Sequence, residues 1–153
     1  MILNLGVIDV PEPEGSTTFE VAEILEGKYG LFSNFAEYGL PDLEDLLANG
    51  ISDAIDNMVA TGQKIDPFAE SMVEIERRFK QEYLSERGVE KIGIAGVPTK
   101  AALEGKSIRF KGRLNAAQWV KGKRGKVSRK IGVRRPSFID SGVLQASFKA
   151  WVE

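Results

Sequence analysis

The sequence of 153 residues contains no histidine and no cysteine. Histidine is the commonest general base of enzymes, cysteine supplies thiol nucleophiles, and both are the usual ligands of zinc. The absence of cysteine also excludes a disulfide-stabilised secreted scaffold and fits synthesis in the cytosol. We therefore expect no enzymatic activity, no cofactor and no bound metal. Carboxylate pairs that meet only in the fold leave a carboxylate hydrolase open as a third alternative.

Long apolar runs are also missing. No stretch of eighteen or more apolar residues is present, so we expect no membrane span and no membrane contact. The first nine residues lack a basic segment and a small-residue cleavage site, which argues against a signal peptide. The length fits one domain over residues 1–153, and a hydrophobic content of 42% is enough for one core.

Charge is nearly balanced in total but strongly segregated along the chain. Residues 1–90 contain 6 Lys and Arg against 19 Asp and Glu, whereas residues 91–135 contain 14 Lys and Arg and one acid, Glu104. Such asymmetry indicates a charged partner or a second copy docked head to tail. The alternative is that the two halves face each other within one fold.

The pattern of apolar residues predicts an α+β domain with two helices packed on a mostly antiparallel sheet. We expect a strand at 2–9, a break at 11–16, and a second strand or short helix at 17–26, within an N-terminal strand and loop region over 1–40. Helices are predicted at 42–61, opened by Pro41, and at 67–87, capped by Asp66. The first helix carries an apolar stripe, formed by Leu43, Leu46, Leu47, Ile51, Ile55, Met58 and Val59.

After the second helix, residues 89–97 suggest a short strand, and Thr99 is expected to cap a helical turn at 100–103. Residues 105–135 are rich in glycine, lysine and arginine and poor in apolar side chains, which predicts a projecting basic loop. We expect this loop to be mobile in the free subunit and ordered only in an assembly.

The basic loop supplies the candidate partner-binding residues. The run at 122–126 does not meet the spacing of a phosphate-binding loop. Such a loop can neutralise nucleic-acid phosphates, and Trp119 could stack on a base, but an acidic surface of a neighbouring subunit is the partner we favour. The candidates are Lys121, Lys123, Arg124, Lys126, Arg129, Lys130, Arg134 and Arg135.

The terminal run returns the chain from the loop to the sheet. Pro136 fixes its own φ and favours extended geometry before it. Asp140 is expected to cap a short helical turn next to Gly142, with Phe138, Leu144 and Phe148 buried beneath it. Alternation from Phe148 to Val152 predicts a final strand.

The same run resembles the R-P-x-[IL]-D-[TS]-G-x-L-x-x-S run of small neck and tail-completion proteins of tailed bacteriophages. In this sequence it reads Pro136-Ser137-Phe138-Ile139-Asp140-Ser141-Gly142-Val143-Leu144-Gln145-Ala146-Ser147-Phe148. The order of helix, basic loop and terminal run over residues 66–153 is similar too. The resemblance does not extend to residues 1–60.

This resemblance implies a small α+β fold with a helix on an antiparallel sheet, and subunits that form a ring where head and tail join. The partners it implies are further copies of the chain and other neck, connector or tail-tube proteins, with packaged DNA as an additional contact. The implied location is the virion, assembled in the host cytoplasm. A nucleic-acid-binding protein that uses residues 105–135 is the alternative function.

Overall fold

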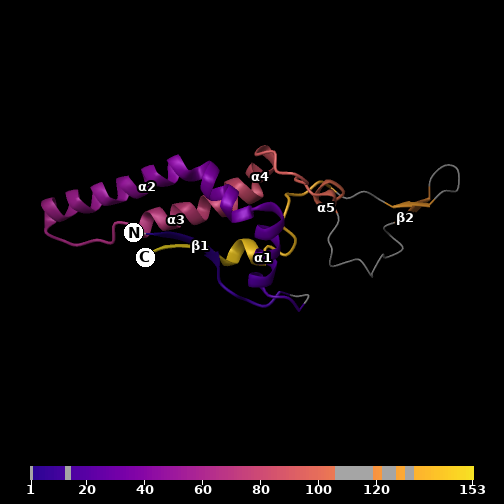
Figure 1. Ribbon diagram of the computed structural model, residues 1–153, viewed down its shortest axis with the longest axis horizontal. Coiled ribbons are helices and arrows are strands. Elements are labelled where there is room, and N and C mark those ends of the chain that lie inside the picture. Colours follow the sequence, from indigo (N-terminus) through magenta and orange to yellow (C-terminus); the bar gives the residue numbers. More distant parts are fainter. Residues whose placement is uncertain (1, 13–14, 106–118, 122–126, 130–132) are drawn as a thin grey trace.

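The computed structural model describes residues 2–12, 15–105, 119–121, 127–129 and 133–153, and its fold is α+β and mostly helical (Figure 1). The described helices are α1 (Thr18–Tyr29), α2 (Leu31–Thr61), α3 (Ala69–Arg77), the π-helix η1 (Arg78–Ser85), α4 (Gly88–Lys91), α5 (Lys100–Leu103) and α6 (Val143–Ser147). The strands are β1 (Leu3–Val7), β2 (Trp119–Lys121), β3 (Val127–Arg129) and β4 (Phe148–Val152). The expected fold class is thus confirmed in its coarse form.

Strands β1 and β4 form an antiparallel pair that brings the two ends of the chain together (Figure 1). The register places Leu3 opposite Val152 and Val7 opposite Phe148. Because side chains alternate along a strand, Leu3, Leu5 and Val7 share the face that packs against the core. The strands predicted at both ends of the chain are confirmed.

Aromatic rings from α2, η1 and β4 form the centre of the core. The rings of Phe79 and Phe148 stack with centroids 3.8 Å apart, and Phe35 meets Phe79 edge-on at 5.1 Å. Phe79 and Phe148 are fully buried. The Tyr83 hydroxyl donates a hydrogen bond to the Leu31 carbonyl at 3.1 Å, and burial raises the pKa of this phenol. The core therefore joins α2 and η1 to the last strand of the chain.

Helix α1 decides between the two alternatives left open for residues 17–26. The Thr17 hydroxyl accepts a hydrogen bond from the Glu20 amide, and the Glu20 carboxylate accepts one from the Thr17 amide. This reciprocal capping box satisfies two backbone donors at the start of the helix. Together with the start of α2, it makes residues 1–40 mostly helical, in contrast to the strand and loop region predicted there.

Helix α2 begins at Leu31, well before the predicted start at residue 42, and Pro41 lies inside it. A proline in a helix interior costs about 3 kcal/mol. The first turns are held by the Glu26 carboxylate, which accepts hydrogen bonds from the Phe32 and Ser33 amides. Burial of Leu31 and Phe35, worth about 1.5–3 kcal/mol each, adds to this, so tertiary contacts outweigh the local preference.

The helix predicted over 67–87 is present as α3 followed directly by η1. The helix begins at Ala69, two residues later than predicted, and its N-cap is Phe68 rather than Asp66. The Asp66 carboxylate accepts a hydrogen bond from the Phe68 amide at 2.9 Å in the turn before the helix. In η1 the Lys80 carbonyl also accepts hydrogen bonds from the side chains of Ser85 and Gln145. The terminal run is thereby tied to this helix.

The strand predicted at 89–97 is wrong, because residues 88–91 form α4 and turns follow. A Cβ at Gly88 would lie 2.7 Å from the Glu82 carbonyl oxygen, so the chain folds back closely against η1. Gly93 and Gly96 have φ values of 84° and 80°, which interrupt extended geometry. The cap at Thr99 is confirmed, since its hydroxyl accepts a hydrogen bond from the Ala102 amide.

Most of the basic segment 105–135 lies outside the described residues. Within it, β2 and β3 form an antiparallel pair with Val120 opposite Ser128. The expectation that this segment is mobile in the free subunit and ordered on assembly concerns residues outside those described, so it stays a prediction.

Candidate functional site

The last turns of α2 extend beyond the rest of the molecule (Figure 1). Helices α2 and α3 touch closely near Gly50, and the Ser71 hydroxyl donates a hydrogen bond to the Leu46 carbonyl at 2.8 Å. Beyond this contact, every residue from 51 to 66 except Ala54 and Asn57 is exposed. We call residues 51–61 the α2 arm.

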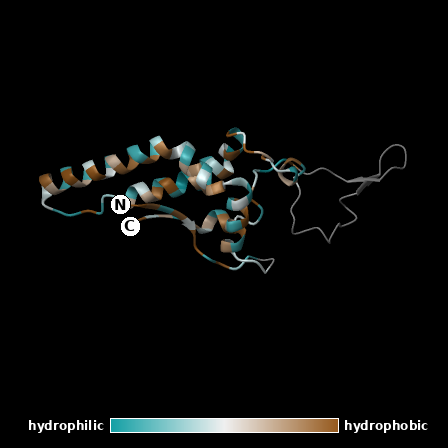
Figure 2. Ribbon diagram, viewed as in Figure 1, coloured by the Kyte–Doolittle hydropathy of each residue, from teal (hydrophilic) through white to brown (hydrophobic). Residues whose placement is uncertain are grey.

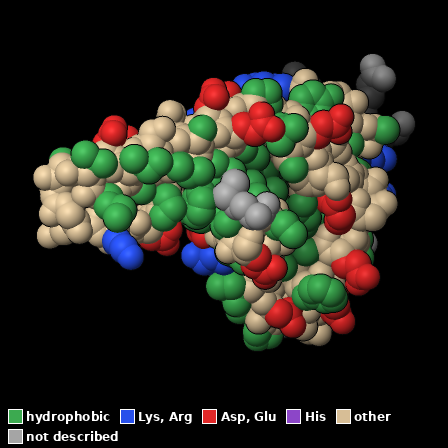
Figure 3. Space-filling model, turned by 60° about the vertical axis from the view of Figure 1, so that its left-hand side comes forward, with side chains coloured by type: hydrophobic (Ala, Val, Ile, Leu, Met, Phe, Trp, Pro, Cys, Tyr) green, Lys and Arg blue, Asp and Glu red, His purple; other side chains and the backbone are tan. Residues whose placement is uncertain are grey.

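The α2 arm carries an apolar stripe that the rest of the described residues leave largely exposed. Ile51, Ile55 and Met58 recur at helical spacing and are 38%, 57% and 52% exposed, and Val59 is 82% exposed. Figure 2 shows hydrophobic residues recurring to the far end of α2, and Figure 3 shows hydrophobic side chains gathered along the arm. The apolar stripe predicted for this helix is therefore buried at Leu43 and Leu47 and exposed from Ile51 onwards, although the sequence pattern predicts that the helix packs on the sheet.

Helix α2 also has charge of one sign only. It contains six acids and no Lys or Arg, the acids being Glu37, Asp42, Glu44, Asp45, Asp53 and Asp56. Of these, Asp42 forms an ion pair with Arg78 of η1 at 3.1 Å. An elongated surface of one sign attracts partners of the opposite sign. The α2 arm thus combines an uncovered apolar stripe with negative charge.

The terminal run is anchored by a buried serine. The Ser137 amide and hydroxyl both donate to the Glu90 carboxylate, at 3.1 and 2.8 Å, and the hydroxyl accepts a hydrogen bond from the Thr99 amide. Burial raises the pKa of the Glu90 carboxyl, but hydrogen bonds from Ser137 and Arg134 outweigh it and leave the pKa below its usual range. Sequence reasoning missed this contact, because its partners are 47 residues apart and no local pattern links them.

Asp140 does not cap the terminal helical turn, contrary to the prediction. Its carboxylate pairs with Arg135, and α6 begins after Gly142, which has a φ of 79°. The Ser141 hydroxyl instead accepts a hydrogen bond from the Val143 amide. The Asp140 carboxylate is thus engaged by Arg135, and Ser141 rather than Asp140 accepts the hydrogen bond at the start of α6.

The burial predicted beneath the terminal run is largely confirmed. Leu144 and Phe148 are buried, whereas Phe138 is half-buried and its ring lies 4.9 Å from that of Tyr29. Leu144 belongs to α6 and Phe148 opens β4, so the two do not share one helical face as predicted. Phe138 itself has a positive φ of 66°.

The predicted partner-binding cations fall into three groups. Arg134 and Arg135 form intramolecular ion pairs with Glu90 and Asp140 and hold the exit of the basic segment. Lys121 and Arg129 belong to β2 and β3. The rest lie outside the described residues: Lys123, Arg124, Lys126 and Lys130. Their role in binding a partner stays a prediction.

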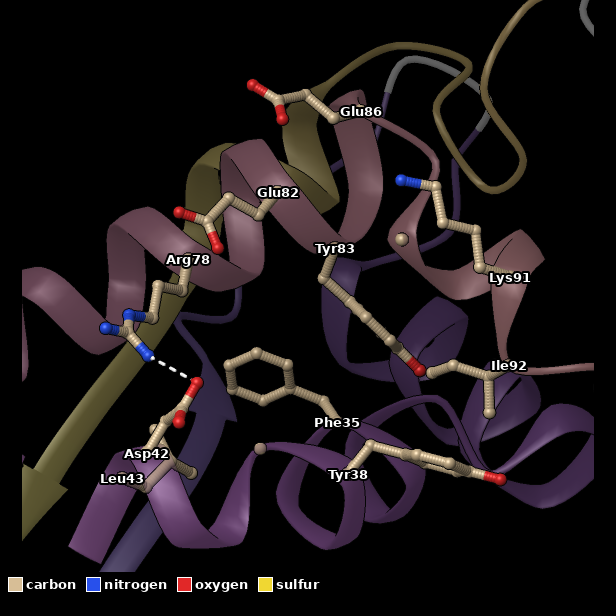
Figure 4. Close-up of a pocket in the computed structure, with 12 residues that line it drawn as sticks. Phe35, Tyr38, Asp42, Leu43, Arg78, Glu82, Tyr83, Glu86, Lys91 and Ile92 are labelled. Carbon is tan, nitrogen blue, oxygen red and sulfur yellow. Dashed lines mark hydrogen bonds and ion pairs between the residues drawn. The ribbon is translucent and has the colours of Figure 1, made fainter. Parts of the chain in front are cut away.

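A pocket of about 450 Å³ opens between α2, η1 and α4 (Figure 4). Phe35, Tyr38 and Tyr83 supply aromatic walls, and Arg78 pairs with Asp42 at its rim. Glu74 also binds Arg78, and hydrogen bonds from Arg77 and Arg78 lower the pKa of the Glu74 carboxyl to about 2. The Arg78 guanidinium is matched by two carboxylates, but Glu82, Glu86 and Lys91 also line the pocket, so it presents charged groups beside its aromatic walls.

No protein-family profile, curated protein or solved structure matches this chain. Within the described residues, no three or more carboxylates are grouped so as to hold a metal ion. Among the helices that the structure describes, α2 included, none has the length and apolar character needed to cross a bilayer.

Proposed function

We propose that this chain is a structural subunit that works by associating with copies of itself, and that it forms a ring in the neck of a tailed phage, joining head to tail or completing the tail. The observation that carries the proposal is the α2 arm. An apolar stripe on a helix that extends, exposed, beyond the rest of the molecule is typical of a surface that another protein buries.

Charge supports self-association as the form this contact takes. The acids of α2 and the cations of residues 91–135 belong to one chain, so a second copy offers the complementary charge that the first one needs. Contact between different surfaces of identical subunits is heterologous, and it closes into a ring when the rotation between subunits permits. The resemblance of residues 136–148 to phage neck proteins supports the location of this ring.

The experiment measures the mass of the purified chain by light scattering and mass photometry over a range of concentrations, followed by negative-stain electron microscopy. We expect a concentration-dependent closed ring. A triple variant, Ile51→Ser, Ile55→Ser and Met58→Ser, should fold normally and fail to assemble. The matched control is Ile24→Ser on α1, also exposed at 64%, which should assemble like the wild type.

The alternative is nucleic-acid binding through the basic segment, which the 14 Lys and Arg of residues 91–135 favour. It predicts binding to duplex DNA that weakens steeply with salt. A chain that stays monomeric at every concentration, yet binds DNA in this manner and loses that binding on neutralisation of Lys121, Lys123, Arg124 and Lys126, would replace the structural proposal with this one.

A further inference from the structure

The outer edge of β1 has backbone groups that bond to nothing in the described residues. Ile2 and Glu153 exchange both backbone hydrogen bonds, and the Ile8 amide donates to the Ser147 carbonyl. The backbone N–H and C=O groups of the even-numbered residues therefore point towards β4. By the alternation of an antiparallel ladder, Leu3, Leu5 and Val7 direct their N–H and C=O groups away from β4. An open edge of this kind is a template for an added strand.

A groove of about 710 Å³ runs along this edge. Its walls include Phe19 and Phe32, and Trp151 of β4 lies at its rim. The groove is lined by two charged residues, Glu23 and Glu26, and both are acids. Glu26 caps α2, whereas Glu23 is exposed and no described cation pairs with it. The groove therefore favours an extended, positively charged segment with some apolar side chains.

The chain contains such a segment in the pair β2–β3. Two strands of three residues each make a sheet that is marginal by itself in water, so it gains from pairing with a further strand. The sequence from 119 to 131 contains six Lys and Arg and no acid, together with Trp119, Val120, Val127 and Ile131. In Figure 1, β2 lies beyond α5, at the end of the molecule away from β1. In the arrangement of Figure 1, β2 and β1 do not meet within one copy, so a contact between them joins different copies.

We propose that the β2–β3 pair of one copy adds to the open edge of β1 in the next copy, seated in the groove beside α1. Backbone hydrogen bonds to Leu3, Leu5 and Val7 supply the pairing, and Glu23 attracts the cations of the incoming strand. This inference rests on the proposed self-assembly and names its second contact. The α2 arm is only about 16 Å long, so an assembly needs further buried surface to reach the size of a stable interface.

The first test is amide hydrogen exchange at single-residue resolution on the full-length chain, as free subunit and as assembly. In the free subunit the amides of Leu3, Leu5 and Val7 should exchange quickly, while those of Asn4 and Gly6, bonded to β4, are protected. On assembly the three outward amides should slow by at least about tenfold. An assembly in which these three amides exchange as fast as before would overturn the inference and leave the proposed function intact.

The second test identifies the incoming strand by charge reversal. Glu23→Lys should weaken association at least about threefold, and so should a variant with Lys121→Glu and Lys126→Glu. A mixture of the two variants should recover the wild-type affinity, because each then meets an opposite charge. Glu70→Lys on α3, another exposed acid outside the groove, is the matched control and should leave association unchanged.

Each remaining outcome is decisive. Protection of Leu3, Leu5 and Val7 without any effect of the charge variants would show that a different strand, such as β1 of a second copy, occupies the edge, and would overturn the choice of β2–β3. A chain that remains monomeric at every concentration would overturn this inference and the proposed function together.

Discussion

Replacing glycine by alanine should change the stability of the chain in opposite directions at two glycines that lie inside helices. Gly27 lies in α1 and Gly50 in α2, and a Cβ added at Gly27 meets nothing within 4 Å. Replacing a glycine by alanine within a helix stabilises it by about 0.8–1.0 kcal/mol. Gly27→Ala should therefore raise the free energy of unfolding by roughly this amount.

At Gly50 the same methyl group has no room. Its Cβ would lie 2.2 Å from the Pro67 carbonyl oxygen and 3.0 Å from the Ser71 hydroxyl oxygen. Overpacking of this kind typically costs about 1–3 kcal/mol, and losing the hydrogen bond from Ser71 to the Leu46 carbonyl adds about 0.5–1.5 kcal/mol. After subtraction of the gain in helix propensity, Gly50→Ala should destabilise the chain by about 0.5–3.5 kcal/mol.

Urea denaturation monitored by circular dichroism measures both variants against the wild type, with the slope of the transition as a check that only stability has changed. The expected difference between the two variants is about 1.5–4.5 kcal/mol. If Gly50→Ala proved as stable as Gly27→Ala, helices α2 and α3 would not cross at Gly50, and the limit between the buried part of α2 and the α2 arm would have to be placed elsewhere.

Three further predictions concern the terminal run and the core. Phe148→Ala should cost about 3–5 kcal/mol, whereas Phe19→Ala, at a site 58% exposed, should cost little; equal losses in urea midpoints would contradict the core assignment. Glu90→Gln should be less stable than the wild type at pH 7, because a carboxyl whose pKa is lowered in the folded state stabilises that state only while it is ionised. The difference in stability should shrink as the pH falls below about 4.5. Thermal melts from pH 7 to pH 3 measure this difference. Asp140→Ala should lower the melting temperature by only a few degrees, since this carboxylate pairs with Arg135 at the surface and caps no helix, and a loss as large as that of Phe148→Ala would refute it.

Sequence patterns of a few residues correctly predicted the elements that depend on contacts between neighbouring residues in the sequence. Thr99 has the side chain and position of an N-cap, and the turn that follows it is helical. The terminal strands alternate and are confirmed. In contrast, the start of α2 depends on Glu26 and on burial of Leu31, both contacts between elements, so the helix-breaking preference of Pro41 misled the prediction.

Long-range contacts explain the other errors. Residues 89–97 supply apolar side chains to the core, but from α4 and the turns after it, because the chain folds back against η1 at Gly88. The Asp140 carboxylate is engaged by an arginine five residues earlier, and Ser141 accepts the hydrogen bond at the start of α6. Neither contact can be recognised from the spacing of residues along the chain.

The apolar stripe of α2 shows where sequence reasoning reaches its limit. Leu43 and Leu47 are buried in the core, and Ile51, Ile55 and Met58 continue the same helical pattern but are exposed. A core face and an interface with another protein require the same spacing of apolar residues, so the pattern cannot distinguish them.

What separates the two parts of the stripe is the point where the intramolecular partner ends. The turn before α3 meets Gly50, and past that position no described helix or strand packs on α2; only the loop at 62–66 returns beside it (Figure 1). The chain nonetheless keeps large apolar residues there at helical spacing, next to Asp53 and Asp56, while its cations are concentrated in residues 91–135. Within the described residues the apolar, acidic surface of the α2 arm is largely uncovered, and the basic segment of a second copy would bring charge of the opposite sign. This complementarity is the physical ground for placing the partner of the arm on a second copy.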